Sequence, residues 1–97
     1  MEQIEFNYPA KRKVQKRAHV GVVGSGDLEV LLEPAEGDVA RVFIRTSVDG
    51  FGDTWKAVLD RFFANYVGAA RIQINDAGAT PGIVQLRLEQ AVEVSER

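Results

Sequence analysis

Hydrophobic and polar residues alternate in four stretches of the chain, at 18–23, 28–32, 42–48 and 70–75. This period of two is typical of a strand with one buried face. Residues 24–27, with the sequence Gly-Ser-Gly-Asp, and residues 34–38, with proline, glycine and aspartate, separate the first three stretches and favour turns. The pattern therefore predicts four strands, the first two of which are joined by a short hairpin turn.

The hydrophobic period lengthens to that of a helix after residue 50. One helical stripe holds Phe51, Trp55, Val58, Leu59, Phe62, Phe63 and Tyr66. This spacing indicates packing into a core rather than an aromatic box for a base or sugar. Residues 83–94 fit either a strand or a helix, because their apolar positions also alternate. Their helix-favouring composition, and Thr80-Pro81 as a cap and first position, lead us to predict a helix there.

These elements follow one another in the order βββαβα, which predicts an α+β fold. We expect a single domain with a mainly antiparallel four-stranded sheet and two helices packed on one face. The first seventeen residues show no sustained period and contain Pro9 and a basic cluster. We therefore interpret residues 1–17 as a flexible basic N-terminal arm and residues 18–97 as the folded domain.

The composition argues against catalysis by this chain alone. A chain of 97 residues has room for one core, but not for a deep substrate cavity as well. It contains no cysteine and a single histidine, His19. Disulfides, cysteine nucleophiles, thiolate metal sites and histidine-rich zinc clusters are thereby excluded. The alternation places His19 away from the main apolar face, at the surface or at a sheet edge.

The charges of the chain are segregated. Five basic residues (Lys11, Arg12, Lys13, Lys16 and Arg17) lie within seven positions, while the formal net charge of the whole chain is −2. The rest of the chain contains seven basic and fourteen acidic residues. This excess of negative charge argues against binding of nucleic acid over most of the surface. There is no apolar run long enough for a membrane span and no signal-peptide pattern, so we expect a cytosolic protein without a membrane partner.

Ser25 is the most exposed candidate for chemistry. Gly24 and Gly26 remove the side chains that would crowd its hydroxyl and permit a tight turn. The segment is neither a nucleophile elbow nor a phosphate loop, and no triad is recognisable. On the residues alone it is either an ordinary hairpin turn or a site where another enzyme modifies the hydroxyl. The Asp27 carboxylate either hydrogen-bonds back to the turn or helps that enzyme recognise it.

Residues 18–34, which contain this turn, resemble the acyl carrier (delta) subunit of bacterial malonate decarboxylase. Residues 46–48, the aromatic helix and residues 76–90, with Asp76-Ala77-Gly78-Ala79, resemble the same family. The resemblance covers nearly the whole chain from Ala18 onward. The carrier subunit of citrate lyase is a more distant likeness, since it also has an attachment serine followed by an aspartate and a later Asp-x-Gly-Ala.

This resemblance implies a non-catalytic carrier, so residues 18–97 would be an acyl carrier domain. Ser25 would bear 2'-(5''-phosphoribosyl)-3'-dephospho-CoA through a phosphodiester, and the thiol of that arm would carry acetyl and malonyl thioesters while malonate is converted to acetate and carbon dioxide. The implied partners are the alpha (acyl transferase) and beta/gamma (decarboxylase) subunits, a prosthetic-group transferase and acyl-loading enzymes. Only Ser25 is carried over from the family as a functional residue. Gly24, Gly26 and Asp27 match the motif, and we infer from the residues that the glycines give access and that Asp27 serves local hydrogen bonding or recognition.

Two alternatives stay open at this point: the citrate lyase carrier, and a small non-covalent adaptor whose Gly-Ser-Gly turn is only structural. The acyl carrier proteins of fatty-acid synthesis differ, because they are helical bundles with Asp-Ser-Leu at the start of a helix. We further hypothesise that residues 11–17 lie near the phosphorylated arm or near an acidic partner surface.

Overall fold

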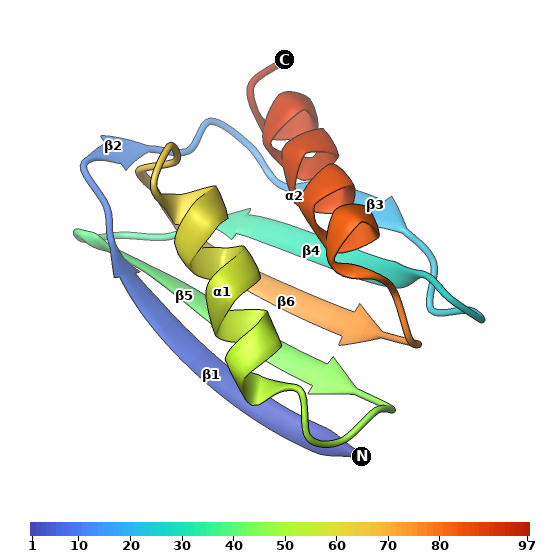
Figure 1. Cartoon of the computed structure of the whole chain (residues 1–97). Helices are drawn as coiled ribbons and strands as arrows, with labels where there is room; N and C mark the ends of the chain where they lie inside the picture. Colours follow the sequence, from blue (N-terminus) through green and yellow to red (C-terminus); the bar gives the residue numbers. More distant parts are fainter.

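The computed structural model describes the whole chain, residues 1–97. Figure 1 shows the elements in chain order: β1 (Glu2–Pro9), β2 (Arg12–Lys13), β3 (Ala18–Gly21), β4 (Leu28–Pro34), β5 (Val39–Thr46), α1 (Gly52–Phe63), β6 (Gly68–Asp76) and α2 (Pro81–Ser95).

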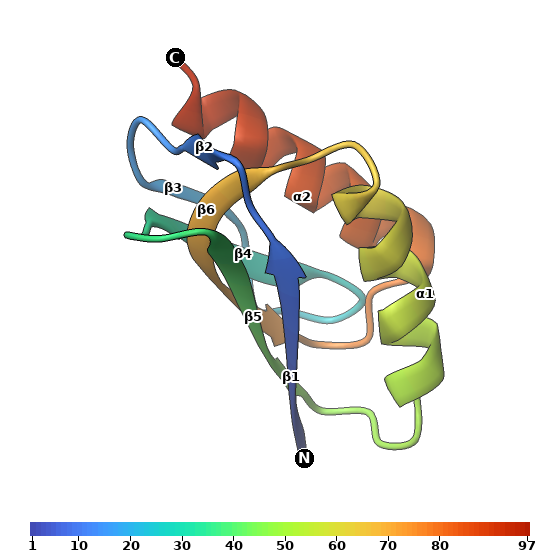
Figure 2. The same ribbon diagram turned by 90° about the vertical axis from the view of Figure 1, so that its left-hand side faces the viewer.

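The strands form one sheet in the order β1-β5-β6-β4-β3, and β2 pairs with the beginning of β6. The β5–β6 and β2–β6 pairs are parallel, and the other pairs are antiparallel. Both helices lie over the same face of the sheet, as the two views in Figures 1 and 2 show. The predicted α+β class and the two helices on one face are confirmed. The sheet is mainly antiparallel, as predicted, but not purely so, because α1 connects β5 to β6 as a crossover and leaves these two strands parallel.

The prediction of a flexible arm over residues 1–17 is wrong. All eight residues of β1 pair with β5, from Glu2 opposite Thr46 to Pro9 opposite Val39. Ile4, Phe6 and Tyr8 are half-buried and pack against the core. Pairing with β5 therefore places the alternating apolar side chains of β1 against the core. The strand ends at Pro9, a residue that an edge strand tolerates.

The second half of the expected arm is also ordered. The backbone N–H groups of Lys11 and Arg12 donate to the Val67 carbonyl oxygen at 2.8 and 3.2 Å. Beyond β2, Val14 is buried. The side chains of the basic cluster nevertheless remain exposed. The chain therefore has six strands instead of four, and its basic cluster lies on a fixed backbone.

The core fills the space between the sheet and the helices. Its fully buried members include Leu28, Val30 and Leu32 of β4 and Ile72 and Ile74 of β6, and the whole cluster comprises 19 buried residues. From α1 it receives four of the predicted stripe residues: Trp55, Leu59, Phe62 and Phe63. Phe51 differs from the prediction, because it precedes the helix and stays 50% exposed.

The ambiguous segment near the carboxyl end is the helix α2, as predicted. The Thr80 side chain accepts a hydrogen bond from the Ile83 backbone N–H at 3.3 Å, and Pro81 occupies the first turn. The buried face consists of Val84, Leu88, Ala91 and Ser95. At 15 and 12 residues, α2 and α1 are both too short to cross a bilayer.

Candidate functional site

Ser25 lies in the connection between β3 and β4, and its side chain is exposed. The Asp27 backbone N–H donates to the Gly24 carbonyl oxygen at 2.9 Å and closes a four-residue turn around Ser25 and Gly26. Gly26 adopts a φ of 75°, in the left-handed region that favours glycine. The predicted tight turn is confirmed, with Ser25 at its tip.

Asp27 anchors this turn to the helix α2. Its Oδ1 accepts from the Leu28 backbone N–H at 2.7 Å, which confirms local hydrogen bonding by this carboxylate. The Arg87 guanidinium of α2 donates two hydrogen bonds to the same carboxylate, from Nε to Oδ1 at 3.1 Å and from Nη2 to Oδ2 at 2.8 Å. These Arg87 hydrogen bonds, followed by the Leu28 N–H, hold the pKa of Asp27 below its usual range. The partner of Asp27 is 60 positions away in the sequence, so no local motif indicated it.

Gly21 lets the two strands approach at the base of the turn. Its φ is 79°, and a Cβ at this position would collide with the Leu28 carbonyl oxygen. The same space is bounded by the side chain of Arg87. Only glycine fits here, and sequence reasoning singled out Gly24 and Gly26 but not this position.

The loop after β6 supports the turn from the other side. The Gly26 N–H donates to the Ala77 carbonyl oxygen and the Ala77 N–H donates to the Asp27 carbonyl oxygen, both at 2.9 Å. This reciprocal pair continues the β4–β6 ladder beyond Asp76. The turn that presents Ser25 is thus fixed on both sides, by Arg87 and by Ala77.

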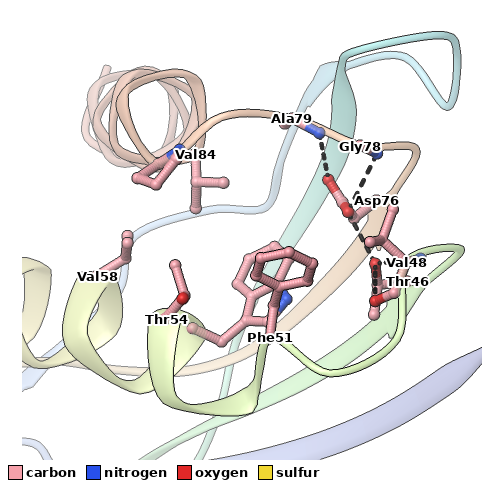
Figure 3. Close-up of a pocket in the computed structure, with 11 residues that line it drawn as sticks. Thr46, Val48, Phe51, Thr54, Val58, Asp76, Gly78, Ala79 and Val84 are labelled. Carbon is pink, nitrogen blue, oxygen red and sulfur yellow. Dashed lines mark hydrogen bonds between the residues drawn. The ribbon is translucent and has the colours of Figure 1, made fainter.

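Asp76 in turn fixes this supporting loop (Figure 3). Its carboxylate is buried: Oδ2 accepts from the Thr46 hydroxyl at 2.8 Å and the Gly78 N–H at 3.2 Å, and Oδ1 accepts from the Ala79 N–H at 3.0 Å. The Asp-x-Gly-Ala motif therefore has a structural role in this chain. One carboxylate ties the end of β5 to the loop that contacts the Ser25 turn.

A cavity of about 250 Å³ adjoins the same loop. Figure 3 shows its lining, which comes from the 46–51 loop, α1, the loop after β6 and the start of α2. Most of the lining side chains are apolar, including Val48, Phe51, Val58 and Val84. Asp76 is the one ionisable residue of the lining.

His19 is an exposed surface residue, as the alternation indicated. Its Nε2 lies 2.9 Å from Glu29 Oε2, and 59% of its side chain is exposed. Glu29 also accepts from the Asn75 side-chain amide at 2.9 Å. The chain has no group of three or more histidine, cysteine, aspartate or glutamate residues that could hold a metal ion. The arrangement around Ser25 presents a hydroxyl, and its polar neighbours serve to hold the turn.

The basic cluster lies at the opposite end of the sheet. Arg12 and Lys13 pair with Gly68 and Ala69 at the start of β6, whereas the Ser25 turn contacts Ala77 just past its end. At about 3.3 Å per residue, a nine-residue strand separates these ends by roughly 26 Å. We call them the β2 end and the Ser25 end. This separation rules out contact between the cluster and a phosphate attached directly to Ser25. The role of the cluster near the rest of the arm or near an acidic partner surface stays a prediction.

Three comparisons with known proteins point to one family. The family model described as malonate decarboxylase delta subunit matches residues 15–95. A malonate decarboxylase acyl carrier protein of Pseudomonas aeruginosa is 52% identical over 94 residues, covering 96% of this chain and 95% of the relative. The corresponding protein of Azotobacter vinelandii is 48% identical over 94 residues, with the same coverage.

A solved structure shares the fold as well. One chain in the crystal structure of a Pseudomonas malonate decarboxylase hetero-tetramer in complex with malonate superposes with a TM-score of 0.93 at 46% identity. The match covers 97% of this chain and 98% of that chain. The likeness therefore includes β1 and β2, which lie outside the residues matched by the family model.

Proposed function

Because this chain belongs to the malonate decarboxylase delta subunit family, we propose that it is the acyl carrier subunit of a malonate decarboxylase complex. We further propose that Ser25 is the residue to which 2'-(5''-phosphoribosyl)-3'-dephospho-CoA is attached through a phosphodiester. The chain itself is then a carrier and not a catalyst.

The observation that supports this proposal most directly is the exposed hydroxyl on a fixed glycine turn. Ser25 is flanked by two glycines, and a Cβ at Gly26 would meet nothing within 4 Å. The surroundings of Ser25 therefore leave room for a bulky substituent. The carboxylate of the same turn, Asp27, is already paired with Arg87, so it opposes a phosphate anion on Ser25 only weakly.

Attachment changes one bond of this chain. The Ser25 Oγ forms a bond to phosphorus and gives up its proton, while an activated form of the group loses its leaving group in the active site of a transferase. When bound, the group supplies a thiol and hence thioester chemistry, which a chain without cysteine cannot supply. The residues around Ser25 hold the turn still, so that the attachment point keeps one position as partners change.

We also propose the partners that this role requires. These are an alpha (acyl transferase) subunit and beta/gamma (decarboxylase) subunits, together with a prosthetic-group transferase and acyl-loading enzymes, in the cytoplasm. The decarboxylating active site belongs to those partners, since stabilising the enolate-like charge next to the thioester needs fixed donors around it. The hetero-tetrameric relative supports assembly with other subunits.

Intact mass spectrometry tests the attachment site. The chain is produced together with the maturation enzymes, and we expect a mass increase equal to phosphoribosyl-dephospho-CoA. Ser25→Ala should abolish the increase, whereas Ser47→Ala, at an exposed serine in a neighbouring loop, should leave it unchanged. An unmodified wild-type chain under these conditions, or a modified Ser25→Ala chain, contradicts the proposal.

Reconstitution with partner subunits tests the substrate. We expect the loaded chain to restore malonate-dependent release of carbon dioxide to a complex that lacks its carrier. Restoration of citrate cleavage instead would identify the citrate lyase carrier. Restoration of carbon dioxide release by the unloaded chain, or by Ser25→Ala, would identify a non-covalent adaptor.

A further inference from the structure

The cavity at the Ser25 end shares a wall with the turn that presents Ser25. Asp76 and Gly78 line the cavity, and Ala77 between them exchanges two backbone hydrogen bonds with the turn. The wall and the attachment point are therefore neighbours joined by a rigid ladder. An arm attached to Ser25 therefore starts on a turn that is hydrogen-bonded to the loop lining this cavity.

The size and chemistry of the cavity fit a short, neutral, mostly apolar group. Its volume of about 250 Å³ lies below the roughly 300–1,000 Å³ of pockets that hold drug-sized ligands. Apolar side chains dominate the lining. Among the lining residues, Thr54 carries a hydroxyl donor and Trp55 an indole N–H donor, whereas the Thr46 hydroxyl already donates to Asp76. A methyl group and a carbonyl oxygen match such a lining.

The charge of the lining disfavours an anion. The cavity contains no lysine, arginine or histidine, and its one ionisable residue is Asp76. The Asp76 carboxylate oxygens accept three hydrogen bonds from Thr46, Gly78 and Ala79. A second carboxylate in this cavity would lose its hydration without gaining a cationic partner, which is costly in an apolar site. An acyl group that ends in a carboxylate is therefore excluded.

We propose that this cavity binds the acetyl thioester at the end of the arm on Ser25, and that it rejects the malonyl thioester. The proposal rests on the carrier function proposed above. Acetyl and malonyl groups differ by one carboxylate, so the cavity separates the two states that the carrier would present. The acetyl group is held and shielded from water and nucleophiles between cycles, whereas the malonyl group stays outside and available to a decarboxylating partner.

Tethering makes even a weak site effective. A flexible tether gives an effective local concentration on the order of millimolar. A cavity that binds a free acetyl thioester with a Kd near 1 mM is then occupied for a large fraction of the time. The site needs no high affinity, and weak binding lets the arm leave readily.

The first experiment uses the loaded, full-length chain. Wild type, Val48→Trp and Val67→Trp are each loaded, checked by intact mass, acetylated or malonylated, and then treated with hydroxylamine. Val48 lines the cavity, while Val67 lies at the β2 end with nearly the same exposure, 37% against 38%. We expect cleavage of the acetyl thioester to be about twofold slower on the wild type than on free acetyl-CoA, and expect Val48→Trp, unlike Val67→Trp, to lose this protection. Equal rates for wild type and Val48→Trp, or equal protection of the malonyl form, would overturn the proposal.

The second experiment does not depend on Ser25 loading. S-Acetyl-N-acetylcysteamine is titrated into the unmodified chain, and amide chemical shifts around the cavity are followed by NMR. We expect saturable shifts at Gly78 and Ala79, a tenfold or greater loss of affinity in Val48→Trp, no loss in Val67→Trp, and no such shifts with the malonyl analogue. If the chain never gains the mass of phosphoribosyl-dephospho-CoA, only the proposed carrier function is refuted. The titration still tests whether the cavity binds an acetyl thioester. Absent shifts would refute the proposal. A Val48→Trp change that impairs only assembly with partner subunits would refute it as well, and would indicate that a partner subunit occupies the cavity.

Discussion

At the Ser25 end of β6, hydrogen bonds to carboxylates hold the loops in place. At the β2 end, tight packing around an aromatic ring holds the chain in place. Asp76 accepts three hydrogen bonds at the first end. At the second end Tyr66 is buried, and Gly68 lies so close to the Tyr66 ring and Val14 that a Cβ at Gly68 would overlap both. The Arg12 guanidinium carbon lies 5.3 Å from the centre of the same ring.

This difference explains how a small domain can keep an exposed turn rigid. Packing fixes groups by surrounding them, so it cannot fix a residue that must stay open to partners. Hydrogen bonds to charged carboxylates are directional and strong, and they can fix a backbone segment without surrounding it. Ser25 stays accessible because the hydrogen bonds of Asp27, Arg87 and Ala77 hold the turn without covering the Ser25 side chain.

Asp76→Ala should have the largest effect of the changes considered. It removes the acceptor of the Thr46 hydroxyl and of two backbone N–H groups at a buried position. We expect the free energy of unfolding to fall by about 3 kcal/mol, measured by urea denaturation. The control Asp49→Ala removes a carboxylate that is 70% exposed and should change stability by less than about 0.5 kcal/mol. Equal effects of the two changes would mean that Asp76 does not hold the Ser25 end together.

Gly68→Ala should disrupt the packing at the β2 end and destabilise the fold. The added methyl group overlaps the Tyr66 ring and Val14, and we expect the free energy of unfolding to fall by about 2 kcal/mol. Gly82→Ala is the matched control, because its Cβ meets nothing within 4 Å in the first turn of α2. The control should be neutral or stabilising by about 0.5 kcal/mol. Thermal or urea unfolding of the two variants side by side measures the difference, and wild-type stability of Gly68→Ala would rule out tight packing at this end.

Arg87→Gln tests the ion pair at the Ser25 end through the pKa of Asp27. Arg87 lowers the pKa of Asp27, so its loss should raise that pKa towards the ordinary value, seen in the NMR titration of the carboxyl carbon. Because the folded-state pKa is the lower one, the Asp27 contribution to stability is present above the ordinary carboxyl pKa and is lost as the pH falls below it. Arg87→Gln should therefore weaken the loss of stability with acid in this range. Arg41→Gln, at an exposed position on the other face of the sheet, serves as the control, and an unchanged Asp27 pKa in Arg87→Gln would show that the ion pair does not form in solution.

Arg12→Gln should have the smallest effect on stability. It removes a cation from the face of Tyr66, and we expect a loss of about 0.5 kcal/mol. Burial raises the pKa of Tyr66 and the Arg12 charge lowers it, so the variant should raise that pKa further, as followed by the ultraviolet absorbance of tyrosinate. Lys13→Gln, at the neighbouring exposed position, should leave the Tyr66 pKa unchanged. A Tyr66 pKa that stays constant in Arg12→Gln contradicts the contact.

The sequence predicted most elements where local period and caps were clear. Thr80 and Pro81 decided correctly between helix and strand for α2. The alternation of Ile4, Phe6 and Tyr8 was also present, but Pro9 and the adjacent charges made residues 1–17 look like an arm. The stability of β1 comes from pairing with β5, a long-range contact that no local window contains.

The Ser25 site was predicted in part. The turn and the exposure of Ser25 followed from its two glycines. The support of the turn did not, because Arg87 is 60 positions from Asp27 and the Thr46–Asp76 hydrogen bond spans 30 positions. Such pairs depend on which loops the topology brings to the same end of the sheet, and a single sequence does not contain that information.

The anchoring of Asp27 by Arg87 also has a consequence for the order of events during synthesis. Arg87 lies in α2, 60 positions after Asp27 in the chain. A ribosome-bound chain that has emerged only through β4 contains Ser25 but lacks both Ala77 and Arg87, which hold the turn. The presentation of Ser25 is therefore completed only after α2 has been synthesised and has folded, and the finished turn distinguishes a chain that contains α2 from a shorter nascent one.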